Sequence, residues 1–358
     1  MTPNKPLSPQ SHPALSQTGF TLVEIMVGLA IGMLATLVIM QVFTVFETQK
    51  RTTTGTADAQ TNGSIALYNI GRELQIAGYP LMPTTNSPLE CTTLTINGTA
   101  DVGSPNSLTP VWIADSFPAT TPAAIVTSDI INIRYGNSPT GGIPTTIGAL
   151  SGNDVTVANN FGCQAGETTL ITNGTTCAIS SASAVTGTTV ITLTDTTAAT
   201  AGADIACLGT WNLVQYKVNN GNLERNGVPI VAGIVNLQAQ FGISDAANSN
   251  QVAQWVDATG GTWGAPTVAD RNRIKAIRIA VVARNPKPET GSVTTTCSST
   301  NSAAPTGLCT WAGSASSPAP TINLNDPFDP NPSWTRYRYR VFETIIPLRN
   351  VIWSKDTL

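Results

Sequence analysis

Six cysteines carry the most reactive side chains of this sequence, and their pattern predicts disulfides. They are Cys91, Cys163, Cys177, Cys207, Cys297 and Cys309. None forms a C-x-x-C pair, and the one histidine is His12, so a zinc site of Cys and His ligands is not expected. An even count in weakly charged, Thr-rich surroundings is typical of an oxidising compartment outside the cytoplasm. Among the possible pairings we expect Cys163–Cys177 and Cys297–Cys309, which leaves Cys91–Cys207.

Side chains that could catalyse a reaction are scarce. Beyond His12 the chain has no histidine, which excludes Ser-His-Asp and Cys-His catalysis there, and no Walker loop or G-x-G-x-x-G motif is present. Asp326 and Asp329 are the nearest carboxylate pair for a hydrolase, but their proline-rich setting indicates a rigid surface loop. Calcium binding by these oxygens is the weaker alternative, because the spacing of an EF-hand loop is absent. We therefore expect no enzyme activity, no cofactor and no metal.

Glu24 is the one charged side chain in an apolar run from Phe20 to Phe46. Such a run fits a single membrane-spanning helix, which needs about 20 mostly apolar residues. A carboxylate in hydrocarbon costs a few kcal/mol and is a candidate functional group, unless it reaches the headgroups from the end of the run. If the chain were cut after Gly19, the new amino group of Phe20 would lie one helical turn from Glu24, on the same subunit or a neighbour. A cation and an anion would then pair.

Two glycines within this run, Gly28 and Gly32, form a small-xxx-small pair. This spacing lets helices approach closely in lipid, although glycine is common in membrane helices for other reasons. After a polar stretch from Glu47 to Gly63, apolar residues recur at helical spacing as Leu67, Ile70, Leu74 and Ala77, and Gly78 with Pro80 ends the pattern. The spacing predicts one long helix over residues 20–78, softened around Gly55 and Gly63, with a membrane span at about 20–46.

The remaining residues, 79–358, are predicted to form a β-rich domain. Short runs of alternating polarity recur between turn residues, and Asn219-Asn220-Gly221 predicts a hairpin turn that needs positive φ. The predicted strands are 128–135, 188–194, 211–218, 223–225, 228–243, 273–283 and 334–346. A Thr-, Ser- and Gly-rich section at about 137–206 has no clear counterpart and is expected to be an insert. Alternation of Arg336, Arg338 and Arg340 with apolar residues favours an antiparallel sheet with one solvated face.

Charge is unevenly distributed along the chain. The net charge is −3, yet the part from Asp270 onward holds 11 basic and 6 acidic residues. A solvated strand face or a subunit interface explains this excess best, because acidic residues and turns interrupt the arginines. Nucleic-acid binding is the alternative.

The string Gly19-Phe20-Thr21-Leu22-Val23-Glu24 resembles the class III signal of type IV pilins and of type II secretion pseudopilins. The resemblance implies that residues 1–19 are a leader, that a prepilin peptidase cleaves between Gly19 and Phe20, and that Phe20 is N-methylated. It also implies a role for Glu24 in assembly and docking. Two departures are the length of the leader and the pair Gln17-Thr18, where many relatives carry a basic residue.

Further segments are similar to the PilW family of minor pilins: Ala66–Tyr79, Asp129–Gly136, Tyr216–Arg225 and Arg273–Arg284. The resemblance implies an α+β, type IV pilin-like fold, in which a long membrane-spanning amino-terminal helix packs on a β-rich, mainly antiparallel domain. It implies a non-catalytic minor pilin that primes type IV pilus assembly in a tip complex. Its expected partners are other minor pilins, the major pilin, the prepilin peptidase and a large tip adhesin.

The resemblance also implies a location in the inner membrane before assembly and in the pilus afterwards, with links to cell adhesion and twitching motility. A minor pseudopilin of type II secretion shares the amino-terminal signal and is the first alternative. A DNA-binding or adhesive tip pilin for natural transformation is the second, and the arginine-rich end would serve it. A membrane-tethered hydrolase is disfavoured by the lack of histidine.

Overall fold

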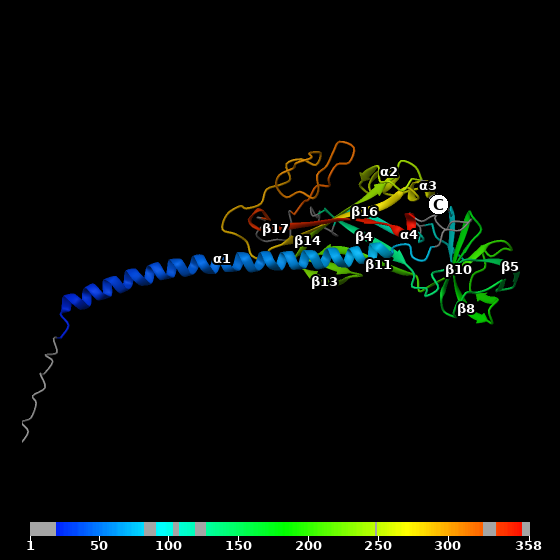
Figure 1. Ribbon diagram of the computed structural model, residues 1–358, viewed down its shortest axis with the longest axis horizontal. Coiled ribbons are helices and arrows are strands. Elements are labelled where there is room, and N and C mark those ends of the chain that lie inside the picture. Colours follow the sequence, from blue (N-terminus) through cyan, green and yellow to red (C-terminus); the bar gives the residue numbers. More distant parts are fainter. Residues whose placement is uncertain are drawn as a thin grey trace, which may run out of the picture. The chain divides into compact units, whose positions relative to one another are not determined.

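The computed structural model of the protein describes residues 19–81, 91–102, 107–118, 127–247, 249–324 and 334–352. The chain divides into two compact units, residues 1–53 and 54–358. Helix α1, Leu22–Ile76, contributes residues to both units (Figure 1). In the first unit its apolar side chains from Leu22 to Phe46 are exposed, and α1 is long and apolar enough to cross a membrane.

The part of α1 that belongs to the second unit has one buried face. Ala59, Ala66, Ile70, Leu74 and Ala77 recur every three or four residues and lie in the main hydrophobic core. Gly78 follows the helix with a φ of 76°, a left-handed conformation that glycine adopts without steric cost, so the predicted helix end is confirmed.

Three glycines of α1 mark where the helix lies close to Asn285 and to strand β17, Tyr339–Pro347. A Cβ atom added at Gly55 would lie 2.1 Å from Asn285 Oδ1, and one added at Gly63 would lie 2.2 Å from Phe342 Cε2. At Gly71 the nearest atom is Ile346 Cδ1, at 3.6 Å. We call Gly55, Gly63 and Gly71 the glycine ladder. The helix is continuous through the glycine ladder, whose members are close-contact positions, and the expected softening at Gly55 and Gly63 stays a prediction.

Two antiparallel sheets share the main hydrophobic core with the helix. The five-stranded sheet has the order β13-β12-β11-β4-β3, and the four-stranded sheet has the order β15-β14-β16-β17. The strands are β3 Val111–Pro118, β4 Thr127–Tyr135, β11 Asn212–Asn219, β12 Asn222–Arg225, β13 Val228–Ala232, β14 Ile234–Ile243, β15 Gln254–Val256, β16 Ile274–Arg284 and β17. Short helices are α2 Gly260–Trp263, α3 Val268–Arg271, the 3-10 turn Trp334–Arg336 and α4 Arg349–Ile352.

Side chains of β4 connect the two sheets. Ser128 Oγ accepts a hydrogen bond from the Leu237 backbone N–H at 3.0 Å, and Asp129 Oδ2 accepts one from Ala239 N–H at 2.6 Å. The predicted hairpin at Asn219–Asn222 is confirmed, since Asn220 and Gly221 have φ of 48° and 71°. Most predicted strands are present, but the run 228–243 is divided by Gly233 into β13 and β14.

A closed six-stranded barrel occupies most of the section expected to be an insert. Its strands are β5 Thr145–Ser151, β6 Asp154–Val157, β7 Thr168–Thr172, β8 Thr176–Thr186, β9 Val190–Leu193 and β10 Asp204–Gly209. They pair in the order β8-β7-β10-β5-β6-β9, and β9 pairs with β8 to close the ring. Strand β1, Thr93–Ile96, joins β8 in parallel, and β2, Thr99–Ala100, pairs with β1. The barrel strands β5, β8 and β10 lie apart from β14 and β17 in Figure 1.

The expected α+β, type IV pilin-like fold class is therefore wrong. The described residues are mostly β, with one long helix at the amino end, and a closed barrel is not a pilin-like feature. The expected long amino-terminal helix is present, and the expectation of a β-rich, mainly antiparallel carboxy-terminal part fits in part. Strand β8 was not predicted because small residues, among them Ala178 and Ala182, occupy its buried positions in place of large apolar side chains.

Candidate assembly site

The amino-terminal segment places its predicted functional residues at the start of α1. Thr21 precedes the helix, and its Oγ1 accepts a hydrogen bond from the Glu24 backbone N–H at 3.3 Å, as an N-cap does. Glu24 therefore lies in the first helical turn, where a negative charge interacts favourably with the helix dipole. Phe20 is 80% exposed. Cleavage after Gly19, methylation of Phe20 and docking by Glu24 stay predictions.

Gly28 and Gly32 lie on the same exposed segment. No described atom outside their own stretch of helix lies within 4 Å of a Cβ added at either position. Their predicted role in helix packing therefore also stays a prediction. A second helix in lipid could approach closely at these glycines.

A buried ion pair fastens α1 to the five-stranded sheet. Glu73 Oε1 accepts hydrogen bonds from Arg225 Nε at 3.0 Å and Nη2 at 2.8 Å. The Glu73 side chain is 6% exposed and that of Arg225 is 38% exposed, so the acid lies deeper than the base. Glu73 Oε2 is buried without a hydrogen bond. Because the carboxylate is held within the interface, this pair fixes the helix against strand β12.

Tyr216 completes the same contact from β11. Its hydroxyl donates to the Asn69 carbonyl oxygen at 3.4 Å. Burial raises the pKa of Tyr216, and its interaction with Glu73 raises that pKa further. The hydrogen bond to Glu73 likewise raises the pKa of Arg225. The sequence prediction did not single out Glu73, although a carboxylate beside the apolar stripe of Ile70 and Leu74 is the signal that could have found it.

Three disulfides link the six cysteines, and one predicted pair is confirmed. Cys297–Cys309 forms as predicted, with a Cα–Cα distance of 4.8 Å. The other two predicted pairs are wrong, because the structure contains Cys91–Cys177 and Cys163–Cys207, with Cα–Cα distances of 5.8 and 5.7 Å. Strand order explains the difference. Cys91 precedes β1, which lies beside β8 and its Cys177, and Cys163 precedes β7, which lies beside β10 and its Cys207.

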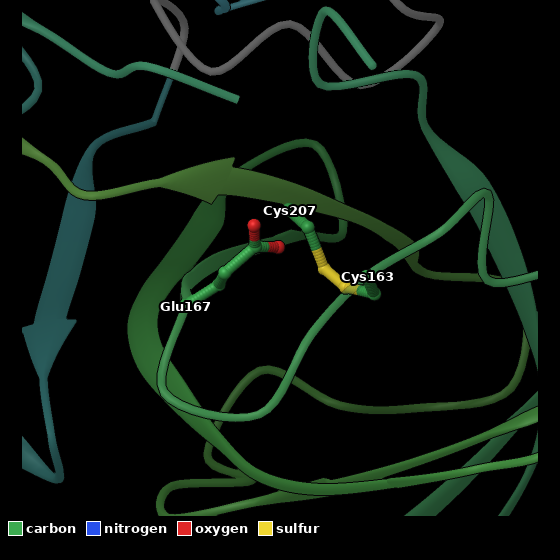
Figure 2. A group of neighbouring side chains, drawn as sticks. All are labelled: Cys163, Glu167 and Cys207. Carbon is green, nitrogen blue, oxygen red and sulfur yellow. A yellow bond between two sulfur atoms is a disulfide. The ribbon is translucent and has the colours of Figure 1, made fainter. Parts of the chain in front are cut away.

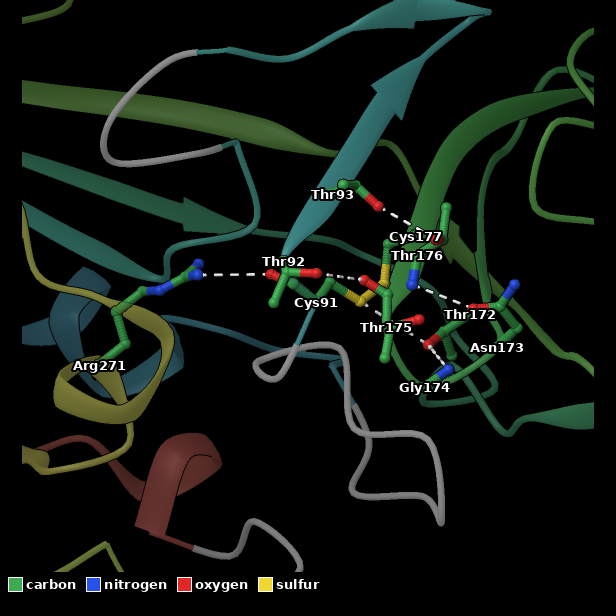
Figure 3. Close-up of a disulfide and its surroundings, with 10 residues drawn as sticks. All are labelled: Cys91, Thr92, Thr93, Thr172, Asn173, Gly174, Thr175, Thr176, Cys177 and Arg271. Atoms are coloured by element: carbon green, nitrogen blue, oxygen red, sulfur yellow. Dashed lines mark hydrogen bonds between the residues drawn. A yellow bond between two sulfur atoms is a disulfide. The ribbon is translucent and has the colours of Figure 1, made fainter.

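Cys91–Cys177 lies where the barrel meets the open sheets (Figure 3). On the barrel side, Thr92 Oγ1 donates to the Thr175 carbonyl oxygen at 3.1 Å. On the other side, Arg271 of α3 donates from Nη2 to the Cys91 carbonyl oxygen at 3.5 Å. Arg271 is buried, which lowers the pKa of its guanidinium. The disulfide therefore links the segment before β1 to barrel strand β8, and the buried Arg271 cation lies at the same junction.

Cys163, Glu167 and Cys207 are the described group whose ligand atoms are close enough to hold a metal ion. Figure 2 shows that the two sulfur atoms are bonded to each other beside the Glu167 carboxylate. A metal needs thiolate sulfur, so the disulfide form offers only the carboxylate as a strong ligand. Asp326 and Asp329, the other predicted candidates for a cation, lie outside the described residues.

A buried arginine between two tryptophans holds the long loop 285–324 on the four-stranded sheet. Arg278 of β16 lies 4.9 Å from the ring centroid of Trp255 and 4.2 Å from that of Trp311. Its Nε donates to Gln240 Oε1 at 2.9 Å. Burial lowers the pKa of Arg278 to about 10, and burial raises the pKa of Asp257 beside it. We call these five residues the tryptophan clamp.

One protein-family model matches the carboxy-terminal part of the chain. Residues 197–350 match the family model of Type IV Pilus-assembly protein W. This range runs from before β10 to α4 and includes the predicted PilW-like segments at 216–225 and 273–284. It covers less than half of the chain and omits α1 and most of the barrel. No curated protein and no solved structure matches the chain. The match supports a PilW-type pilus protein that takes part in type IV pilus assembly.

Proposed function

We propose that this protein is a minor pilin that primes type IV pilus assembly as part of a minor pilin complex at the pilus tip. The observation that carries the proposal is the match of residues 197–350 to the PilW family model. The prepilin-like string at Gly19–Glu24 and the exposed apolar part of α1 support it independently, because the matched range includes neither.

The proposed mechanism is mechanical. A prepilin peptidase cleaves after Gly19, the new amino terminus at Phe20 is methylated, and the apolar span holds the subunit in the inner membrane. During incorporation the Phe20 amine and the Glu24 carboxylate of neighbouring subunits form an ion pair. Such a pair stabilises one register of packing, since an unpaired charge in hydrocarbon is costly.

The second unit presents surfaces to partner subunits and does no chemistry in this proposal. The ion pair Glu73–Arg225 and the three disulfides stabilise its shape. The expected partners are other minor pilins, the major pilin and a large tip adhesin. A rigid surface suits this role, because ordering a flexible surface would weaken each contact.

Counting surface pili by electron microscopy tests the priming role. We would compare a strain that lacks this gene with the same deletion that also lacks the retraction motor. Loss of pili in the first strain and partial recovery in the second is the expected result, since initiation competes with retraction. Unchanged pilus numbers in both strains would contradict the proposal.

The variant Glu24→Ala tests the docking step separately. Cleavage of the leader should continue, because the carboxylate lies beyond the scissile bond, while incorporation into pili should fall. Glu47→Ala is the matched control, since Glu47 is an acidic residue of α1 just past the apolar run, where it pairs with Arg51 at 2.9 Å. Normal incorporation of Glu24→Ala, measured by immunoblotting of sheared pili, would exclude the docking role.

A further inference from the structure

Five basic residues lie on two backbone segments that pair where β16 ends and β17 begins: Arg284, Lys287, Arg336, Arg338 and Arg340. We call them the basic cluster. Arg338 Nε donates to Glu289 Oε1 at 2.7 Å, and Arg336 Nε donates to the Glu289 carbonyl oxygen at 2.8 Å. These contacts bring Arg336 and Arg338 to one point of the surface. The Glu289 carboxylate offsets one of the five positive charges.

An aromatic ring lies against one member of the basic cluster. The Arg284 guanidinium lies 4.7 Å from the ring centroid of Tyr337. Lys287 and Arg340 are exposed, and the Arg338 side chain is 51% exposed. Exposed guanidinium groups suit phosphate, which arginine binds with two parallel hydrogen bonds. Tyrosine is also enriched where protein meets lipid headgroups.

The basic cluster lies at the end of the second unit to which the apolar run is joined. The Asn285 backbone N–H donates to the Arg338 carbonyl oxygen at 2.9 Å, and the Asn285 side chain meets the helix at Gly55. Phe46, the last residue of the apolar run, precedes Gly55 by nine residues. Nine residues reach about 30 Å at most. If residues 20–46 span a membrane, this short tether keeps the basic cluster at a high effective concentration near the headgroups.

We propose that the basic cluster binds the phosphate headgroups of anionic lipids while the subunit is stored in the membrane. The proposal rests on the membrane anchoring in the proposed function and adds a second, electrostatic contact to it. Anionic lipid surfaces attract basic segments that lie close to a membrane span. Nucleic acid is the less favoured polyanion, because the whole chain has a net charge of −3 and the tether favours lipid.

Hydrogen exchange of the full chain in lipid nanodiscs tests the proposal. One set of discs contains phosphatidylglycerol in phosphatidylcholine, and the other contains phosphatidylcholine alone. Peptides that cover residues 284–293 and 334–341 should exchange several-fold more slowly in the anionic discs. The protection should disappear in about 1 M salt, where the Debye length falls to about 3 Å.

Two variants separate lipid binding from local folding. Lys287→Gln/Arg340→Gln removes two exposed charges outside the Glu289 contacts and should abolish the lipid-dependent protection. Arg72→Gln is the matched control, because Arg72 is an exposed arginine of α1 far along the helix from Gly55, and it should leave the protection unchanged.

Three results would overturn the proposal. Equal exchange in both kinds of disc would show that anionic lipid is not bound. Stronger protection of the same peptides by duplex DNA in the neutral discs would reassign the basic cluster to nucleic acid. Failure of the full chain to enter discs of either composition would refute the anchoring itself, and so would be distinguishable from failure of the lipid contact.

Discussion

The two halves of the ion pair Glu73–Arg225 should differ in what their removal costs. Arg225→Ala leaves a carboxylate that is 6% exposed, without its cation and with Oε2 already lacking a hydrogen bond. Breaking a buried pair in this way costs about 3–5 kcal/mol. Glu73→Ala leaves Arg225, which is 38% exposed and can turn to water. The loss of the Glu73 carboxylate should therefore cost about 1.5–3 kcal/mol of folding free energy, the range for a hydrogen bond to a charged group.

Urea unfolding of the full chain in detergent, followed by tryptophan fluorescence, measures the loss of unfolding free energy in each single variant. The double variant Glu73→Leu/Arg225→Leu should be more stable than Arg225→Ala, because no charge is then buried alone. Equal destabilisation by the two single variants, or a larger loss for Glu73→Ala, would refute the assignment of Glu73 as the deeper and more dependent partner.

Three further changes have defined outcomes. Gly63→Ala places a methyl group against the ring of Phe342 and should cost about 1–3 kcal/mol in urea unfolding, part of which Phe342→Leu in the same chain should restore. Asp195 accepts hydrogen bonds from the Gly98 N–H at 2.7 Å and the Thr197 N–H at 2.9 Å, and Asp195→Asn should destabilise the protein by about 1–3 kcal/mol at pH 7. Burial raises the pKa of Asp195, but the hydrogen bonds that it accepts outweigh burial, so the net pKa is lowered. The difference in stability between Asp195→Asn and the unaltered protein should therefore vanish as pH falls below the ordinary aspartate range. Trp311→Ala removes one face of the tryptophan clamp and should speed limited proteolysis in the loop that carries Cys297–Cys309, whereas unchanged cleavage would refute that role.

Features encoded by local pattern could be predicted from the sequence. The helix end at Gly78, the hairpin turn at Asn220-Gly221 and strand β16 each depend on residues within a short window. In all three cases backbone preference or periodicity is sufficient, and no distant contact is needed.

Features that depend on strand order could not be predicted. The pairings Cys91–Cys177 and Cys163–Cys207 follow from which strands are neighbours in the barrel. Sequence proximity is a weak guide to such pairs, since doubling a loop costs only about 0.6 kcal/mol in closure entropy. The pair Glu73–Arg225 was missed for the same reason, because its partners are far apart in the chain and meet only after the sheet forms.

The glycine ladder has a mechanical consequence. Its members are eight residues apart, about 12 Å along the helix, and they meet Asn285, Phe342 and Ile346. The Asn285 N–H is hydrogen-bonded to Arg338, which directly precedes β17, so positions 338, 342 and 346 are also evenly spaced, about 13 Å apart. Helix and strand thus share one repeat. A pull along the helix axis must shear all three contacts at once, whereas a sideways pull opens them one after another, so the unit should resist axial load far better than peeling.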